Sequence, residues 1–99
     1  MITKKEALAE MKARRGYDTI ILFHNGDSYD IYEQDASRVA ELWGIETETI
    51  DGTITFRVPE HEQSKVTNRL LNEGIAVSVC EMLDMDGFFV TGINKIDDE

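Results

Sequence analysis

An Asn-Gly pair at residues 25–26 constrains the fold of this chain more than any other feature. Asn-Gly is the strongest short signal for a tight β-hairpin, because both residue types tolerate the positive φ angles that such turns require. A β-rich apolar run, Thr19–His24, precedes the pair, and Ser28–Tyr32 follows it. We therefore predict that the first run is a central strand and that the second returns antiparallel beside it.

Three segments carry apolar residues at helical spacing, and a glycine directly follows each of them. The first begins with a capping box, Thr3–Glu6, and ends near Arg15. In such a box the two side chains satisfy amides that the first helical turn leaves without partners. The other two predicted helices cover Asp35–Trp43 and His61–Glu73. A glycine just past the last turn is the usual residue at a helix C-terminus, so these boundaries favour helices.

Further strands are predicted from alternating apolar residues and turn signals. Asp51-Gly52 indicates a second hairpin, and Pro59 ends its second strand because proline has no amide to donate. The strands in question are Ile45–Ile50, Thr53–Val58, Ile75–Cys80 and Gly87–Ile93. With three helices, about six strands and no linker, residues 1–99 are predicted to form one α+β (α/β) domain on a mixed, mainly antiparallel sheet. Residues 1–6 and 94–99 are expected to be frayed ends.

Composition places the chain among soluble globular domains, with 41% hydrophobic and 30% charged residues in 99 positions. The longest strongly apolar run, Ile20–Phe23, is far shorter than the roughly 20 residues of a membrane span. The basic first residues are not followed by the apolar stretch of a secretory signal. Cys80 is the single cysteine, so no internal disulfide is possible and a reducing cytoplasm is the expected location.

The net charge of −10 argues against strong binding to nucleic acid, because an acidic field repels phosphate. The charge is uneven, however: residues 1–15 carry five basic and two acidic groups, and the other 84 residues carry five basic and 18 acidic groups. Any contact with a nucleic-acid backbone should therefore favour the N-terminal helix. The candidate contact residues are Lys4, Lys5, Lys12, Arg14, Arg15, Lys65 and Arg69. The simpler interpretation, that these side chains only solvate helix faces, is the one that the charge balance favours.

Three segments resemble one protein family in the same order and spacing, over roughly residues 7–93. Residues 26–30, Gly-Asp-Ser-Tyr-Asp, resemble the Gly-Asp-Phe-Tyr-Glu motif of the N-terminal, mismatch-recognition domain of the DNA mismatch-repair protein MutS. Residues 54–61 resemble that family's stretch ending Gly-Val/Ile-Pro-Tyr-His, and here they end Arg-Val-Pro-Glu-His. Residues 70–81 resemble its Leu-Val-Asn-Gln-Gly-Glu-Ser-Val-Ala-Ile-Cys-Glu-Gln. The resemblance predicts the MutS domain I fold for nearly the whole chain.

The resemblance also implies where DNA would be contacted. In MutS this domain enters the minor groove, the motif Phe wedges beside the mispaired base, and the Glu two residues later hydrogen-bonds that base. The matching positions here are Ser28 and Asp30, with Asn25 and Gly26 in the adjoining turn. Because residues two apart on a strand share a face, Ser28, Asp30 and Tyr32 should point together. Tyr29 and Ile31 would then point to the core.

The chemistry at these positions departs from the family pattern. An apolar wedge offsets the unstacking of a base step, which costs a few kcal/mol, and aromatic stacking on a base contributes about 1–3 kcal/mol. Ser28 supplies neither contribution, and Asp30 is one methylene shorter than the family's Glu. Asn25 also replaces the family's basic residue before Gly-Asp. We therefore predict that mismatch selectivity is weak or lost.

Other kinds of site find little support in the sequence. The spacing of His24, His61 and Cys80 matches no metal-ligand pattern, so no metal is predicted. A nuclease would need acids clustered with a lysine, and the acids of residues 27–33 and 46–48 are better explained as solvated. The aromatic residues Trp43, Phe56 and Tyr32 could form a base-stacking platform, but Trp43 at a helix end and Phe56 inside a hairpin are better explained as core residues. No phosphate-binding loop is present, so neither an enzymatic activity nor a cofactor is expected.

Two functions remain open. The first is a stand-alone MutS domain I homologue that binds duplex DNA through Ser28 and its neighbours. The second is a regulatory module that binds a DNA-repair protein, or fills a basic DNA-binding groove, through an acidic face. The first needs a basic patch near Ser28, whereas Asp27, Asp30, Glu33 and Asp35 make the sequence acidic there. Charge therefore favours the second function and the family resemblance favours the first, while the oligomeric state is not predicted.

Overall fold

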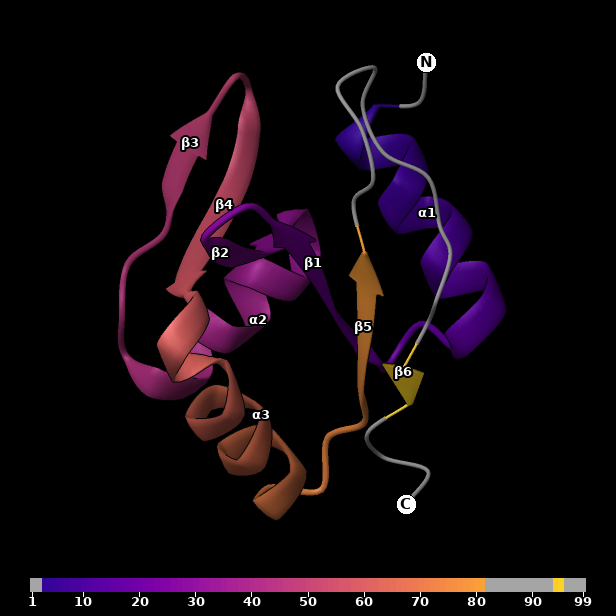
Figure 1. The fold of residues 1–99 in the computed structure, drawn as a ribbon. Helices are drawn as coiled ribbons and strands as arrows, with labels where there is room; N and C mark the ends of the chain where they lie inside the picture. The colour runs from indigo at the N-terminus through magenta and orange to yellow at the C-terminus, as the bar shows by residue number, and fades with distance from the viewer. Residues whose placement is uncertain (1–2, 82–93, 96–99) are drawn as a thin grey trace.

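A six-stranded sheet with helices on both faces forms the part of the chain that the computed structural model describes, residues 3–81 and 94–95 (Figure 1). In chain order the elements are α1 (Lys4–Arg15), β1 (Ile20–Asn25), β2 (Ser28–Tyr32), α2 (Glu33–Trp43), β3 (Glu48–Ile50), β4 (Thr53–Pro59), the 3-10 turn η1 (Glu60–Glu62), α3 (Gln63–Asn72), β5 (Val77–Glu81) and β6 (Asn94–Lys95). No helix within these residues is both long and apolar enough to cross a membrane.

The strands lie in the order β3-β4-β2-β1-β5-β6. Every neighbouring pair is antiparallel except β1 and β5, which run parallel from Ile20 beside Val77 to His24 beside Glu81. The predicted fold class, a single α+β domain with three helices and a mixed, mainly antiparallel sheet, is confirmed.

Both predicted hairpins form, but the turn of the first lies one residue later than expected. Asn25 pairs with Ser28, so Gly26 and Asp27 are the turn residues. Only Gly26 has a positive φ, 66°, which matches turns that place glycine first. In the second hairpin Ile50 pairs with Thr53, and Asp51-Gly52 forms the turn as predicted. Both of its turn residues have positive φ, 52° and 80°, as a type I′ turn requires.

Two predicted strands begin later than expected for the same physical reason. The amide of Ile45 donates to the carbonyl of Ala40 at 3.0 Å and so helps to cap the end of α2. The amide of Ile75 donates in the same way to Leu70 of α3 at 3.0 Å. Backbone groups that close a helix cannot also enter a β-ladder. Consequently β3 begins at Glu48 instead of Ile45, and β5 covers 77–81.

Other boundaries shift by a few residues. Helix α2 begins at Glu33 directly after β2, two residues before the predicted start. The predicted third helix divides into η1 and α3. Thr3 caps α1 with both halves of the capping box, so residues 4–6, assigned to a frayed end from the sequence, form its first turn. Asn94 and Lys95, assigned to the other frayed end, pair with β5. The predicted strand Gly87–Ile93 lies outside the described residues.

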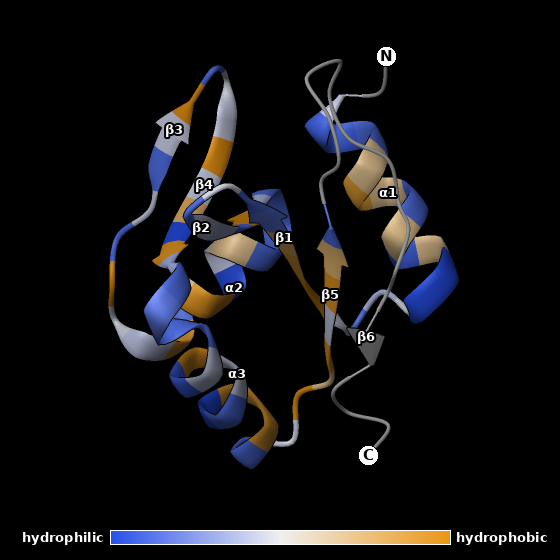
Figure 2. Ribbon diagram, in the orientation of Figure 1, coloured by the Kyte–Doolittle hydropathy of each residue, from blue (hydrophilic) through white to orange (hydrophobic). Residues whose placement is uncertain are grey.

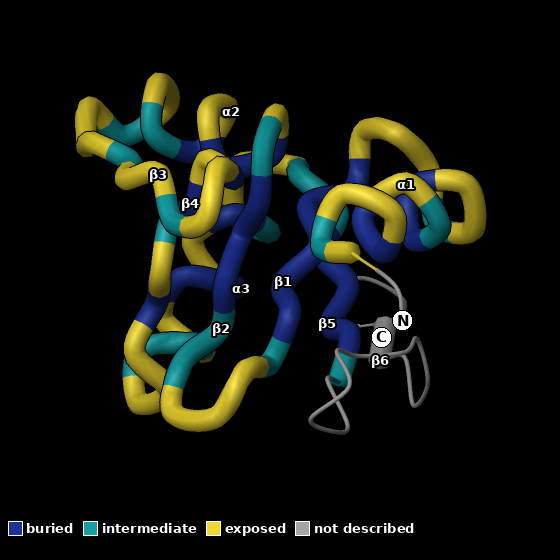
Figure 3. Tube along the Cα trace, turned by 90° about the horizontal axis from the view of Figure 1, so that it is seen from above, coloured by how far each residue is buried: buried dark blue, intermediate teal, exposed yellow. Residues whose placement is uncertain are grey.

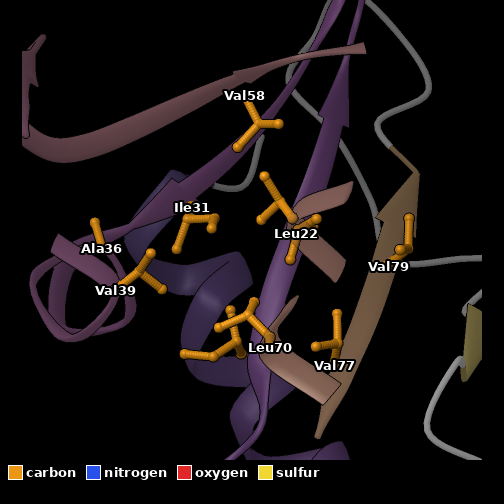
Figure 4. Packing of buried hydrophobic residues seen from close by; sticks show 10 residues of the cluster. Leu22, Ile31, Ala36, Val39, Val58, Leu70, Val77 and Val79 are labelled. Atoms are coloured by element: carbon orange, nitrogen blue, oxygen red, sulfur yellow. The ribbon is translucent and has the colours of Figure 1, made fainter. Parts of the chain in front are cut away.

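The alternating faces of the strands bury two separate cores. Ile20 and Leu22 of β1 join α2 and α3 on one face, whereas Ile21 and Phe23 join α1 on the other. We call these the α2/α3-side core and the α1-side core. Figure 4 shows the first, in which Val39 of α2 and Leu70 of α3 pack with residues of strands β1, β2, β4 and β5. Its buried members are Ile20, Leu22, Ile31, Ala36, Val39, Val58, Val66, Leu70, Val77 and Val79.

The α1-side core is smaller and is completed by a buried ion pair. Its members are Ala7, Leu8, Met11, Ile21, Phe23, Tyr32 and Cys80. Beside it the Nζ of Lys12 contacts Asp35 Oδ1 at 2.6 Å and the carbonyl oxygen of Thr19, and Asp35 Oδ2 accepts the amide of Ile21 at 3.1 Å. Lys12 and Asp35 therefore join α1, β1 and α2 within the interior. Largely apolar β1 and β5 run between the two cores (Figure 2), and both strands are mostly buried (Figure 3).

Candidate nucleic-acid interface

Asp30 and Arg57 form a bidentate ion pair on the α1 side of the sheet. Asp30 of β2 lies directly opposite Arg57 of β4 in the antiparallel register. Arg57 Nε donates to Asp30 Oδ1 at 3.0 Å, and Nη2 donates to Oδ2 at 3.1 Å. This two-point geometry is the strongest that an arginine makes with a carboxylate. The hydrogen bonds that Arg57 donates to Asp30 accordingly raise the pKa of Arg57, although burial opposes this shift.

Three further polar groups surround the Asp30 carboxylate. Ser28 Oγ donates to Oδ1 at 3.0 Å, while Asn25 Nδ2 and the Tyr32 hydroxyl donate to Oδ2 at 3.4 Å. Ser28, Asp30 and Tyr32 therefore do share one face, as predicted. Burial raises the pKa of Tyr32, and the neighbouring Asp30 charge raises it further. The Tyr32 hydroxyl thus remains protonated and available as a donor to Asp30.

Asp30, which matches the base-contacting Glu of the resembled motif, is therefore blocked from contact with a base, and the sequence did not indicate this. Asp30 is fully buried and both of its oxygens are occupied, so the carboxylate is not free to accept a hydrogen bond from a base. Arg57, in contrast, leaves 42% of its side chain exposed. Arg57 is not among the contact residues predicted from the sequence. The available signal was the Arg-Val-Pro of residues 57–59, which stands where the resembled stretch has Gly-Val/Ile-Pro.

We call Ser28, Asp30 and Arg57 together the Asp30–Arg57 site. Two of the predicted backbone-contact residues lie near it. Lys4 Nζ lies 5.4 Å from the centre of the Tyr32 ring, and Tyr32 contacts Asp30. Lys5 pairs with Glu33 at 3.4 Å and remains largely exposed. Both lysines line a hollow between the start of α1 and the β3–β4 turn. The first turn of α1 therefore brings two cations to the same side of the sheet as Arg57.

The other predicted contact residues are dispersed. Lys12 is 1% exposed and is held by Asp35, so its assignment as a surface contact is corrected. The apolar face of α1 turns Lys12 inward, and Asp35 compensates its charge. Arg14 pairs with Glu10 at 2.8 Å near the end of α1, one residue before Arg15, which ends the helix. The two basic residues of α3, Lys65 and Arg69, belong to the helix that covers the opposite face of the sheet.

Glu60, Glu81 and His24 form an acidic cluster near the turn between β1 and β2. His24 Nδ1 is 2.9 Å from Glu81 Oε1, and His24 Nε2 is 3.0 Å from Glu60 Oε2. Its ring stacks on Tyr29 with 4.2 Å between ring centres. Partial burial disfavours charge on the imidazole, but the hydrogen bonds and charges of Glu81 and Glu60 outweigh it, so the pKa of His24 is raised. Two carboxylates on two ring nitrogens are satisfied only by the doubly protonated imidazolium.

The remaining candidates from the sequence are far apart. His61 is exposed and lies 3.7 Å from Glu62, and Cys80 is buried in the α1-side core. Tyr32 is buried in that core too, whereas Trp43 and Phe56 pack against the α2/α3-side core. The three aromatic residues therefore do not form one stacking surface, and the predicted packing of Trp43 and Phe56 against the core is confirmed.

Comparison with known protein families identifies one family that matches most of the chain. The family model described as MutS domain I matches residues 6–89. The chain belongs to the MutS domain I family. Its relatives include the DNA mismatch repair protein MutS of Petrotoga mobilis, 32% identical over 75 residues, and that of Caulobacter vibrioides, 35% identical over 81 residues. A third is the MutS protein of Treponema pallidum, 33% identical over 66 residues.

These matches cover most of this chain but a small part of each relative. The aligned residues make up 75%, 76% and 67% of this chain, and 9%, 9% and 7% of the Petrotoga, Caulobacter and Treponema proteins. The family membership therefore applies to one domain of MutS. The structure brings Ser28, Asp30 and Arg57, three positions at which the sequence departs from the motifs that it resembles, into one site.

Proposed function

We propose that this chain is a non-enzymatic, duplex-DNA-binding module of the mismatch-repair type that contacts DNA without a wedge and has little or no mismatch selectivity. Family membership supports DNA as the partner. The exposed edge of Arg57, together with Lys4 and Lys5, supplies cations on the side of the sheet that carries the motif residues. The single cysteine is consistent with action in the reducing cytoplasm.

The observation that carries this proposal is the Asp30–Arg57 ion pair. The residue at the wedge position is a serine, and the carboxylate that would read the base is bonded to an arginine. To contact a base, Asp30 would have to release the bidentate Arg57 guanidinium and become exposed. Arg57 can instead use donors that Asp30 does not occupy to reach phosphates, or the acceptors that every base pair presents in the minor groove. Such contacts contribute to binding affinity but discriminate poorly between matched and mismatched duplexes.

The test is a fluorescence-anisotropy titration of matched, G·T-mismatched and unpaired-base duplexes at low salt. The natural chain is compared with a triple variant, Ser28→Phe/Asp30→Glu/Arg57→Gly, which introduces the residues of the resembled motif at those three positions. We expect the natural chain to bind the three duplexes with similar affinity and the triple variant to gain a preference for the defective ones. A preference for defective duplexes in the natural chain would show that another residue reads the lesion.

A variant with unchanged net charge tests the contribution of the Arg57 guanidinium to DNA binding. Asp30→Asn/Arg57→Gln keeps the net charge and hydrogen-bonding groups at the site while removing both charges. If Arg57 contacts phosphate, this variant should bind all duplexes more weakly and lower the salt slope by about 1. Glu10→Gln/Arg14→Gln, which removes an exposed ion pair of α1 and also leaves the net charge unchanged, is the control and should have a smaller effect on binding. Equal effects of the two variants would show that the Asp30–Arg57 site is not the contact.

A second function, binding to a repair protein or to a basic DNA-binding groove, is favoured by the acidic cluster. Glu60 and Glu81 enclose His24 next to the hairpin turn, and residues 16–99 carry an excess of 13 acidic groups. Under this alternative the natural chain should bind no duplex at low salt. It should instead form a salt-sensitive complex with a basic DNA-binding protein, and Glu60→Gln should weaken that complex.

A further inference from the structure

Asn25 and Gly26 lie at the exposed tip of the hairpin formed by β1 and β2 (Figure 3). Asn25 pairs with Ser28 as the last pair of the ladder. Gly26 has φ 66°, with open space where a Cβ would lie. Within residues 3–81, no hydrogen bond from the Gly26 amide is found. The ladder therefore does not hold this amide, and no side chain of its own hinders it.

An asparagine that precedes a glycine can lose its side-chain amide without an enzyme. The Gly26 nitrogen gives up its proton and attacks Asn25 Cγ, the Cγ–Nδ2 bond breaks, and Nδ2 leaves as ammonia with a proton gained in exchange. The product is a five-membered cyclic imide. Water then opens this ring at either carbonyl and leaves a carboxylate, as aspartate or as isoaspartate, in which the main chain runs through the former side-chain carbon. The only co-reactant is water.

Ring closure requires the Asn25 side chain to fold back onto the Gly26 amide, so the last pair of the ladder must open. Openings at exposed turns cost far less free energy than global unfolding. Asn25 is the only asparagine of the chain that precedes a glycine. Asn68 and Asn72 lie in α3, and the amide that follows Asn72 is hydrogen-bonded to carbonyls of that helix. We therefore expect Asn25 to be the most reactive of these three asparagines.

We propose that Asn25 is a site of spontaneous deamidation and that the carboxylate so formed disrupts the Asp30–Arg57 site. Asn25 Nδ2 donates to Asp30 Oδ2 at 3.4 Å. Loss of ammonia replaces this donor by a second carboxylate beside the fully buried Asp30, and two like charges at this distance repel each other. The new carboxylate also competes with Asp30 for the half-exposed Arg57 guanidinium.

Isoaspartate perturbs the hairpin as well as the charge. It lengthens the main chain by one methylene group immediately before the two-residue turn of Gly26 and Asp27. Loop length fixes the register of a hairpin, so the longer chain strains the pairing of residue 25 with Ser28. The backbone of Asp27 resists this change, because its carbonyl accepts the amide of Glu60 at 2.9 Å. Both products therefore act on the same site.

The consequence for DNA rests on the proposed function, in which Arg57 contacts the duplex. A carboxylate beside Arg57 offsets the charge of that cation. The deamidated chain should therefore bind matched and defective duplexes more weakly, with a salt slope lower by about 1. The deamidation itself does not depend on whether the chain binds DNA.

Peptide mass spectrometry of the incubated full chain tests the modification. Residues 16–38 form one tryptic peptide, in which Asn25 is the only asparagine. We expect this peptide to convert to its aspartate and isoaspartate forms before Asn68 or Asn72 loses its amide. The conversion should be faster at higher pH, because the Gly26 nitrogen must lose a proton. A sample digested without incubation corrects for loss during digestion, and Asn25→Gln, which would need a larger ring, should stay unchanged. Loss at Asn25 no faster than at Asn68 and Asn72 would overturn the proposal.

The variant Asn25→Asp reproduces one product and tests its effect on the site. It should unfold at lower urea concentration than the natural chain and should bind duplexes with a salt slope lower by about 1. Asn68→Asp adds the same charge at an exposed position of α3, across the sheet, and is the control for duplex binding. A urea midpoint equal to that of the natural chain would refute the disruption of the Asp30–Arg57 site. A lower midpoint with unchanged duplex binding would support that disruption and would count against Arg57 as the DNA contact.

Discussion

The buried Lys12–Asp35 pair should make each partner depend on the other for stability. Lys12→Met leaves the Asp35 carboxylate in the interior with only the Ile21 amide as a partner. Removing one member of a buried ion pair costs about 3–5 kcal/mol, because the other charge remains desolvated. Domains of this kind have total stabilities of about 5–15 kcal/mol. For a domain of this size each kcal/mol lowers the melting temperature by roughly 4–8 °C, so we expect a fall of at least roughly 12 °C.

Replacing Lys12 and Asp35 together should lower the free energy of unfolding far less than replacing Lys12 alone. Lys12→Met/Asp35→Asn removes both charges, and the Asn side-chain oxygen still accepts the Ile21 amide. Buried ion pairs replaced by uncharged groups of similar volume often leave stability unchanged, so the double variant should lie within about 1 kcal/mol of the natural chain. Urea unfolding followed by Trp43 emission and circular dichroism gives the free energy of unfolding for the natural chain, Lys12→Met, Asp35→Asn and the double variant. A double variant as unstable as the sum of both single variants would refute the reasoning.

The pH dependence of Lys12→Met provides an independent check. Burial raises the pKa of Asp35, and Lys12 and the Ile21 amide partly offset this shift. Without Lys12 the pKa should rise further, so the folded state takes up a proton more readily than the unfolded state. Stability of the variant should therefore increase as pH falls through that raised pKa. A penalty that does not change between about pH 7 and pH 5 would contradict the account.

Two further predictions concern single positions. The pKa of His24 is raised above its ordinary value of 6.5, so its stabilising contribution is fully present below pH 6.5 and is lost as pH rises through the raised pKa. Melting temperatures measured across this range should converge for the natural chain and His24→Gln at high pH, and a gap that does not change with pH would argue against an imidazolium. Gly44 ends α2 with φ 68° and open space around its Cα, so Gly44→Ala should cost about 1–2 kcal/mol of backbone strain in urea unfolding. An unchanged free energy of unfolding would show that this turn relaxes.

Local signals in the sequence predicted the local structure well. The Asp51-Gly52 turn and the Thr3 capping box form as expected, because a few neighbouring residues determine each of them. The turn of the first hairpin was displaced by one residue, since glycine at position 26 can begin a turn as readily as end one. The late starts of β3 and β5 could not be anticipated, because they depend on helix carbonyls that compete for the amides of Ile45 and Ile75.

The candidate site was harder to predict because its decisive contacts join distant residues. Asp30 and Arg57 are brought together by the register of β2 and β4, which no local pattern encodes. The sequence around Lys12 is that of a solvated helix lysine. Only the position of α2 shows that Lys12 pairs with Asp35 in the interior. The shared face of Ser28, Asp30 and Tyr32 was predictable, since alternation along a strand is a local property.

The parallel pairing of β1 with β5 determines the order in which this domain can be assembled. His24 and Glu81 are neighbours in the sheet although 57 positions separate them in the chain, whereas each hairpin closes within a few residues. Both hairpins can therefore form early, but the apolar β1 keeps an open edge until β5 has been synthesised. During translation this interval exposes Ile20–Phe23 to pairing with other chains. A polypeptide stalled before residue 77 should therefore be retained by chaperones or aggregate, and release should follow the emergence of β5 from the ribosome.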